Sequence, residues 1–152
     1  MAKAWDPALA QSLIEEQLTL EGPALPILHA LQDTFGCVPD EAVAMMAKAL
    51  NISRAEAHGA VSFYHDFRRQ PGGRRVVKVC RAESCQAMGG AAAGDFLLAA
   101  LGLDWGGTTS DGEITVEPVY CLGLCAVSPA ALIDGEPLGR LDGVALVEAV
   151  RG

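Results

Sequence analysis

The sequence is poor in basic residues, in aromatic residues and in long apolar runs. Its 11 Lys and Arg stand against 19 Asp and Glu, for a net charge of −8. The clustered positive charge that binds phosphate backbones is therefore missing, and nucleic acid is not an expected partner. No apolar run reaches membrane-spanning length, since Gly94 and Asp95 interrupt the most apolar helix. Acids and a proline also occupy the first residues, where a signal peptide needs an uninterrupted apolar segment, so we expect a soluble, cytoplasmic protein.

Apolar residues are plentiful, at 51% of the 152 residues. This composition predicts a folded globule, either one ordinary domain or two small ones. The N-terminal half shows helical spacing over 6–20, 24–35, 39–51 and 53–67. Asp6 is a plausible N-cap of the first helix, and Ser53 and Glu56 have the spacing of a capping box. On the last of these helices Phe63 and Phe67 would share a face, either for core packing or for a partner.

A Pro-Gly-Gly turn at 71–73 is the best domain boundary. It divides the chain into an N-terminal helical segment, 1–72, and a second domain, 73–152. In the second domain the pattern predicts a strand at 75–79, a helix at 86–102, a strand at 113–120, a hairpin around Asp134-Gly135 and a helix at 142–150. The order β-α-β-β-α predicts fold class α/β, with a thioredoxin-like α/β domain after the helical segment.

The 5 cysteines are unevenly spaced. Cys80 and Cys85 form a C-x4-C pair, Cys121 and Cys125 form a C-x3-C pair, and Cys37 stands apart. Each pair follows the end of a predicted strand. Loops at neighbouring strand ends can converge, so four thiols could surround one small inorganic centre.

Several chemistries suit four such thiols. A [2Fe–2S] cluster and a structural zinc both take four cysteine ligands, although zinc sites favour tighter spacings. Disulfides need an oxidising compartment, and a catalytic dithiol is normally C-x-x-C at a helix start. Spacing and context favour the iron–sulfur cluster and leave zinc and thiol chemistry open.

Three stretches carry a resemblance to a known family. The segment LPILHALQDTFGCVPDEAVAMMAKALNISRAEAHGAVSFYHDF, with its closing F-Y-x-x-F, precedes VCRAESC and CLGLCAVSPA. In this order they resemble the small [2Fe–2S] subunit shared by respiratory complex I, NAD-reducing hydrogenases and NAD-dependent formate dehydrogenases. The short length and the wording V-C-R-A-E-S-C are most similar to the gamma subunit of molybdenum-containing, NAD-dependent formate dehydrogenases.

The resemblance implies a role and a ligand set. It implies one [2Fe–2S] cluster held by Cys80, Cys85, Cys121 and Cys125, and no substrate-converting site in this chain. Single electrons would be exchanged with the FMN of an NAD-binding partner subunit, and a larger molybdenum subunit would oxidise formate to carbon dioxide. Cys37 has no place in the set, and we expect it to be a small buried residue.

Other polar residues are assigned smaller roles. His29, His58 and His65 fall in predicted helices and are expected to pack there rather than to bind metal. Arg81, next to Cys80, is a candidate positive charge near the cluster.

Overall fold

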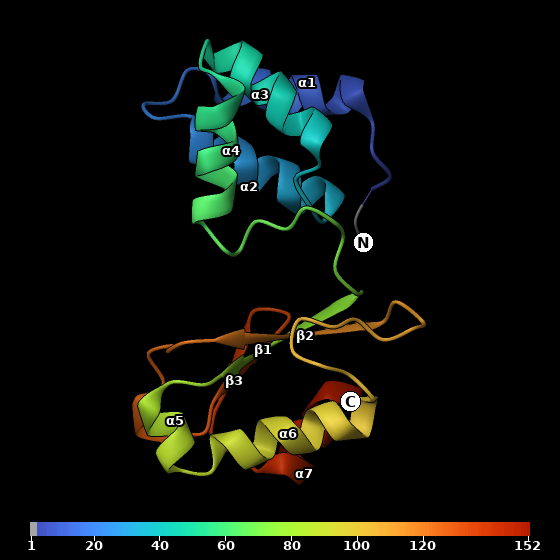
Figure 1. Ribbon diagram of the computed structural model, residues 1–152, viewed down its shortest axis with the longest axis vertical. Helices are drawn as coiled ribbons and strands as arrows, with labels where there is room; N and C mark the ends of the chain where they lie inside the picture. The colour runs from blue at the N-terminus through green and yellow to red at the C-terminus, as the bar shows by residue number, and fades with distance from the viewer. Residues whose placement is uncertain (1–2) are drawn as a thin grey trace. The chain divides into compact units, whose positions relative to one another are not determined.

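The structure is a computed structural model that describes residues 3–152. It divides into two units, Met1–Pro71 and Gly72–Gly152, both drawn in Figure 1. The sequence places this division one residue further along the chain. Within residues 3–152, no helix is long and apolar enough to cross a membrane.

The N-terminal unit consists of helices. They are α1 (Pro7–Gln17), α2 (Ala24–Phe35), α3 (Asp40–Leu50) and α4 (Arg54–Phe63). Asp6 caps α1 by accepting hydrogen bonds from the N–H groups of Ala8 and Leu9. Ser53 and Glu56 form the expected capping box at the start of α4. Apolar side chains from all four helices meet in one buried cluster, which includes Ile14, Leu28, Val43 and Val61.

Helix α4 ends four residues before the predicted limit. Tyr64 leaves the helix in an extended conformation, and the N–H of Phe67 donates to the Tyr64 carbonyl. Phe67 is thereby buried at 7% exposure, whereas Phe63 is 74% exposed. The prediction that these two rings share a helix face was wrong, because the aromatic residues here favour the helix only weakly and burial of Phe67 requires the turn.

The C-terminal unit is built on a four-stranded sheet of order β2-β1-β3-β4. The strands are β1 (Arg75–Cys80), β2 (Ile114–Val119), β3 (Ala131–Ile133) and β4 (Glu136–Leu138). Strands β1 and β2 are parallel, and the other pairs are antiparallel. Asp134 and Gly135 form the predicted hairpin turn, both with positive φ. Helices α6 (Gly90–Leu101) and α7 (Gly143–Arg151) lie together along one face of the sheet (Figure 1). The α/β fold class expected from the sequence, a helical segment followed by an α/β domain, is confirmed.

The single helix predicted over 86–102 is in fact two. Helix α5 (Glu83–Ala87) already contains Cys85, and the chain breaks at Gly89, whose φ is 90°, before α6 begins. Gly90 lies so close to the end of α5 that a Cβ there would stand 2.6 Å from the Cys85 carbonyl oxygen. The glycines therefore allow a tight corner just after Cys85 rather than a continuous helix.

Candidate metal centre

The sheet topology brings the two cysteine pairs together. Strands β1 and β2 are parallel neighbours, so their carboxyl ends lie at the same edge of the sheet. Cys80 is the last residue of β1 and stands opposite Val119, the last residue of β2. The N–H of Arg81 donates to the Val119 carbonyl at 2.7 Å and extends this pairing. Cys121 follows two residues after Val119, which puts the second pair beside the first.

The first pair is buried. Cys80 is 3% exposed and Cys85 is 2% exposed, and both pack against Ala130. The N–H of Cys80 donates to the Ala130 carbonyl at 3.0 Å, so Cys80 is held between β2 and the start of β3. These two sulfurs are therefore fixed by regular secondary structure.

The second pair is exposed and lies on a tight loop. The sulfurs of Cys121 and Cys125 are 3.7 Å apart. Cys121 has a φ of 85°, which is costly for a residue with a side chain and is typical of functional loops. Gly123, at φ 76°, donates its N–H to the Cys121 sulfur at 3.4 Å. The glycine therefore provides the close turn that the sequence predicted between these cysteines.

The Cys80 sulfur is surrounded by hydrogen-bond donors. Burial acts to raise the pKa of this thiol, but backbone N–H groups of Ala82, Cys121 and Leu122 and the Cys85 thiol outweigh it and lower the pKa. N–H groups lower the pKa because they stabilise the charged form of the sulfur. The backbone is thus arranged to hold a thiolate at Cys80, the form that binds metal.

The four sulfurs influence one another electrostatically. The pKa of Cys125 is raised, first by its hydrogen bond and charge interaction with Cys121, then by burial and by the charges of Cys85 and Cys80. All four thiols cannot readily ionise together without a cation, because like charges repel. A bound metal centre supplies that positive charge and releases the protons.

The donor set fits a binuclear cluster. The Cys85 thiol hydrogen-bonds to the Cys80 sulfur, and the Cys121 and Cys125 sulfurs are 3.7 Å apart, so the cysteines stand as two neighbouring pairs. A [2Fe–2S] cluster takes four cysteine sulfurs, two for each iron. Cys80, Cys85, Cys121 and Cys125 match that set in number, in pairing and in chemistry.

The fifth cysteine has a different setting. Cys37 lies between α2 and α3 in the N-terminal unit and is 6% exposed. Burial raises the pKa of its thiol. It is the small buried residue that the sequence predicts.

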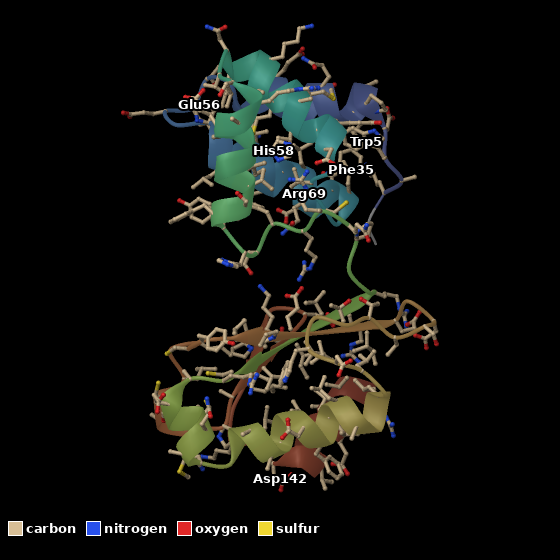
Figure 2. All side chains as sticks on the ribbon, in the orientation of Figure 1. Trp5, Phe35, Glu56, His58, Arg69 and Asp142 are labelled. Carbon is tan, nitrogen blue, oxygen red and sulfur yellow. The ribbon has the colours of Figure 1, made fainter. Side chains whose placement is uncertain are left out.

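The three histidines also lie in the N-terminal unit. The His29 ring stands 5.1 Å from the Phe67 ring in an edge-on arrangement. The Nδ1 atom of His58 is 3.4 Å from the Arg69 guanidinium, and both residues are labelled in Figure 2. His65 lies in the turn after α4, so its expected place in a helix was wrong.

Two hydroxyls lie beside the cysteines, and the sequence predicts no role for either. Ser84 precedes Cys85, and Ser128 follows Cys125 by three residues; their Oγ atoms are 2.9 Å apart. The one signal in the sequence is that a serine lies close to each cysteine pair. Only the fold brings the two serines together. The sequence also indicates Arg81 as a charge near the site but does not predict its partner, Trp105. The Arg81 guanidinium carbon lies 4.8 Å from the centre of the Trp105 ring.

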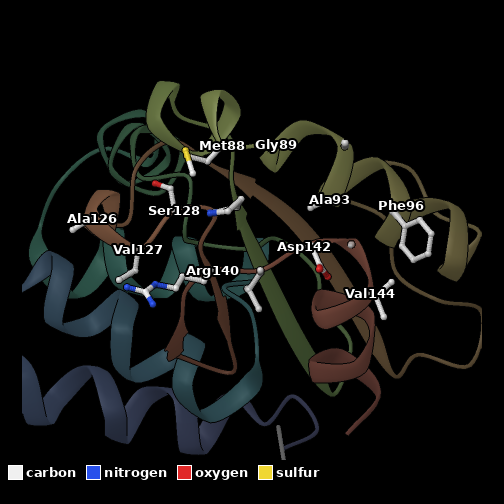
Figure 3. A pocket seen from close by; sticks show the side chains of 14 residues that line it. Met88, Gly89, Ala93, Phe96, Ala126, Val127, Ser128, Arg140, Asp142 and Val144 are labelled. Atoms are coloured by element: carbon white, nitrogen blue, oxygen red, sulfur yellow. The ribbon is translucent and has the colours of Figure 1, made fainter.

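A pocket of about 760 Å³ adjoins both cysteine loops. Its walls come from the α5–α6 corner, from the segment after Cys125 and from the start of α7 (Figure 3). Met88, Phe96 and Val144 line it and are 64%, 51% and 57% exposed. Three large apolar side chains are thus exposed beside the cysteine loops.

Known proteins resemble this chain over most of its length. It is 37% identical over 144 residues to a subunit of the NADH-quinone oxidoreductase of Pseudomonas aeruginosa, covering 91% of this chain and 87% of that protein. It is 29% identical over 128 residues to a subunit of the NADP-reducing hydrogenase of Solidesulfovibrio fructosivorans, covering 84% of this chain and 75% of that one.

Solved structures share the fold. A crystal structure of NAD⁺-reducing [NiFe]-hydrogenase in the H₂-reduced state matches with a TM-score of 0.72 and 29% identity. That match covers 84% of this chain and 21% of the hydrogenase chain, so this protein spans about a fifth of its structural relative.

A family model covers nearly the whole chain. The model described as thioredoxin-like [2Fe-2S] ferredoxin matches residues 10–152, a range that includes both cysteine pairs and the complete sheet. Together with the thiolate-stabilising edge of that sheet, the match identifies the chain as a member of the thioredoxin-like [2Fe–2S] ferredoxin family, with a [2Fe–2S] cluster as its cofactor.

Proposed function

We propose that this chain is the small electron-transfer subunit of a cytoplasmic, NAD-dependent formate dehydrogenase. Its cluster is held by Cys80, Cys85, Cys121 and Cys125. The observation that carries the electron-transfer role is the meeting of these four cysteines at one sheet edge in a ferredoxin-family chain. The formate assignment is supported by the resemblance of residues 79–85, V-C-R-A-E-S-C, to the gamma subunit of such enzymes.

The cluster, when bound, accepts and releases one electron at a time. The chain's own residues set how readily it does so. N–H groups of Ala82, Cys121 and Leu122 stabilise negative charge on the Cys80 sulfur and favour the reduced form. Burial of Cys80 and Cys85 opposes this effect by disfavouring added charge.

Partner subunits supply the two-electron chemistry in this proposal. Hydride transfer to NAD⁺ moves two electrons, so a flavin must divide them for a one-electron carrier. We assign FMN and NAD to one partner and the molybdenum cofactor to a larger, formate-oxidising one. The exposure of residues Cys121 and Cys125 supports this arrangement, because it leaves one side of the site open to a partner. Tyr120 and Met88, 72% and 64% exposed, lie beside the same loops.

The corresponding subunit of complex I or of an NAD-reducing hydrogenase is the second candidate. The similarity to NADH-quinone oxidoreductase and hydrogenase chains supports it equally well. The electron-transfer role is the same in both cases, and only the partners differ. A structural zinc module has less support, because the family match favours iron–sulfur.

Isolation of the native complex separates these candidates. A tagged copy of the chain is expressed in the organism that makes it, and the co-purifying subunits are identified by mass spectrometry. Formate, H₂ and NADH are then supplied in turn with NAD⁺ or quinone. We expect a molybdenum-containing partner and formate-dependent NADH formation. A nickel-containing partner with H₂-dependent NADH formation, or a quinone-reducing complex, would overturn the formate assignment.

A further inference from the structure

Two serine hydroxyls connect the buried and the exposed cysteine loops. Ser84, in α5, and Ser128, after the 3-10 turn η1 (Cys125–Val127), have Oγ atoms 2.9 Å apart. Both hydroxyls reach the Cys125 carbonyl, Ser128 at 2.9 Å and Ser84 at 3.3 Å. The Cys85 sulfur lies 3.6 Å from the Ser128 Oγ and donates its thiol proton there. Ser128 is 8% exposed, so this contact is shielded from water.

The Cys85 sulfur changes from a donor to an acceptor when the cysteine becomes a metal ligand. A cysteine that binds metal has lost its proton, and its sulfur can then only accept. At the same time the Cys125 carbonyl has a surplus of donors. The N–H of Ser128 reaches it at 3.4 Å, in addition to the hydroxyls of Ser128 and Ser84. The two hydroxyls have one proton each for their contacts with this carbonyl and with each other, and the Ser128 N–H still satisfies the carbonyl when both hydroxyls turn away.

We infer that Ser128 is a positioning residue that donates its hydroxyl proton to the Cys85 sulfur when Cys85 serves as a ligand. Rotation of the hydroxyl about its Cβ–Oγ bond is enough, because the oxygen already lies 3.6 Å from that sulfur. The Ser84 hydroxyl then donates to the Ser128 Oγ across 2.9 Å, and the Ser128 N–H remains on the Cys125 carbonyl. The inference rests on the ligand set proposed above and does not depend on which substrate the complex oxidises.

This hydrogen bond acts on the reduction potential. An O–H donor at a ligand sulfur stabilises negative charge, and the reduced state is the more negative one. The bond is buried, and a charge-assisted bond in a low-dielectric site is stronger than its equivalent at the surface. Ser128 therefore raises the potential, in addition to linking the two loops.

The contact between the two serines also borders the pocket. Ser128 is one of its wall residues, together with Met88, as Figure 3 shows. A partner that fills the pocket would exclude the remaining water from Ser128 and strengthen its bond to the Cys85 sulfur.

The test is a redox titration of the full chain with its cluster, followed by EPR. We expect Ser128→Ala to keep its iron and to lower the reduced-to-oxidised ratio at a fixed potential about tenfold, which is about 59 mV for a one-electron couple. Ser128→Thr keeps the hydroxyl and should restore the wild-type ratio. Ser84→Ala is the matched control, because it removes a loop contact and leaves the Ser128 hydroxyl in place, and we expect a smaller shift.

Two results would overturn the inference. One is an unchanged potential in Ser128→Ala with full iron content. The other is an equal shift in Ser84→Ala, which would assign the effect to the loop link instead of the sulfur. Ser128→Gly, which also lacks the hydroxyl, is judged by the same measure if Ser128→Ala loses its cluster. A wild-type chain without iron would overturn the ligand set as well, whereas a hydrogenase or quinone partner would overturn only the formate assignment.

Discussion

Each unit of the protein contains a buried cysteine whose thiol pKa is shifted, and the two shifts have opposite signs. Cys37 in the helical unit and Cys80 in the α/β unit are 6% and 3% exposed. Burial alone raises the pKa of Cys37. Cys80 experiences the same effect, yet N–H donors from Ala82, Cys121 and Leu122 lower its pKa. Burial therefore does not decide what a cysteine does; the donors around its sulfur do.

The surroundings of the two cysteines explain this difference. Cys37 stands between α2 and α3, and burial is the cause of its pKa shift. Cys80 stands where a strand ends, and the N–H groups of the next loop are free to turn toward its sulfur. The end of β1 and the loop that follows it therefore favour a thiolate at Cys80.

Exchange of Cys80 gives the largest expected effect, and exchange of Cys37 is its matched control. Cys80→Ser should reduce the iron content from about two per chain to near zero, since serine is a poor ligand for this cluster. Cys37→Ser should leave it unchanged. Iron and acid-labile sulfide, counted on anaerobically purified protein, measure both. Loss of iron in Cys37→Ser, or full iron in Cys80→Ser, would remove the contrast between the two residues.

Gly123 in the α/β unit and Gly59 in the helical unit extend the comparison of the two units to the backbone. Gly123→Ala forces a side chain into a positive φ of 76° and should destabilise its loop by about 1 kcal/mol. We expect faster loss of the cluster absorbance in the presence of a chelator. Gly59 is exposed within α4 and has open space where a Cβ would be, so Gly59→Ala is the control. It should stabilise the helical unit by about 0.5–1 kcal/mol and leave the chelation rate unchanged. Equal chelation rates in both variants would contradict the proposed role of the loop.

Loss of the positive charge of Arg81, next to Cys80, should have a smaller effect on the cluster. The Arg81 guanidinium stacks on Trp105, and its buried Nε has no hydrogen-bond partner. A positive charge held there favours the reduced cluster, so Arg81→Ala should lower the potential, while Arg81→Lys should preserve most of it. Redox titration by EPR measures the shift. An unchanged potential in Arg81→Ala would show that this charge does not reach the cluster.

The helical unit should respond to acid through its capping box. Side-chain and backbone hydrogen bonds from Ser53 lower the pKa of Glu56. A carboxyl group with a lowered pKa stabilises the fold above its unfolded pKa, about 4.3, and that stability is lost as the pH falls through the folded value. The melting temperature of the helical unit should therefore fall less between pH 7 and pH 3 in Glu56→Gln than in the wild type, as measured by circular dichroism. A wild-type slope in this variant would exclude Glu56 as a cause.

The sequence predicts the parts of this site that depend on local patterns. The strand before Cys80, the strand before Cys121 and the Gly123 turn all have the expected form. Because β1 and β2 are parallel neighbours, the convergence of the two pairs follows from the strand assignment.

Other features depend on contacts that no local pattern contains. The corner at Gly89 was missed because the glycine- and alanine-rich stretch is compatible with either a helix or a break. The contact of Ser84 with Ser128 spans 44 positions, and only the fold brings them together. The stacking of Arg81 on Trp105 likewise joins a strand end to a distant loop.

The central claim is that four cysteines at one sheet edge hold a [2Fe–2S] cluster. The most direct measurement is absorption and low-temperature EPR of the anaerobically purified chain before and after dithionite, with iron, sulfide and zinc counted on the same sample. We expect a red-brown oxidised form, a rhombic EPR signal on reduction and about two irons per chain. A colourless, EPR-silent protein with one tightly held zinc would contradict it.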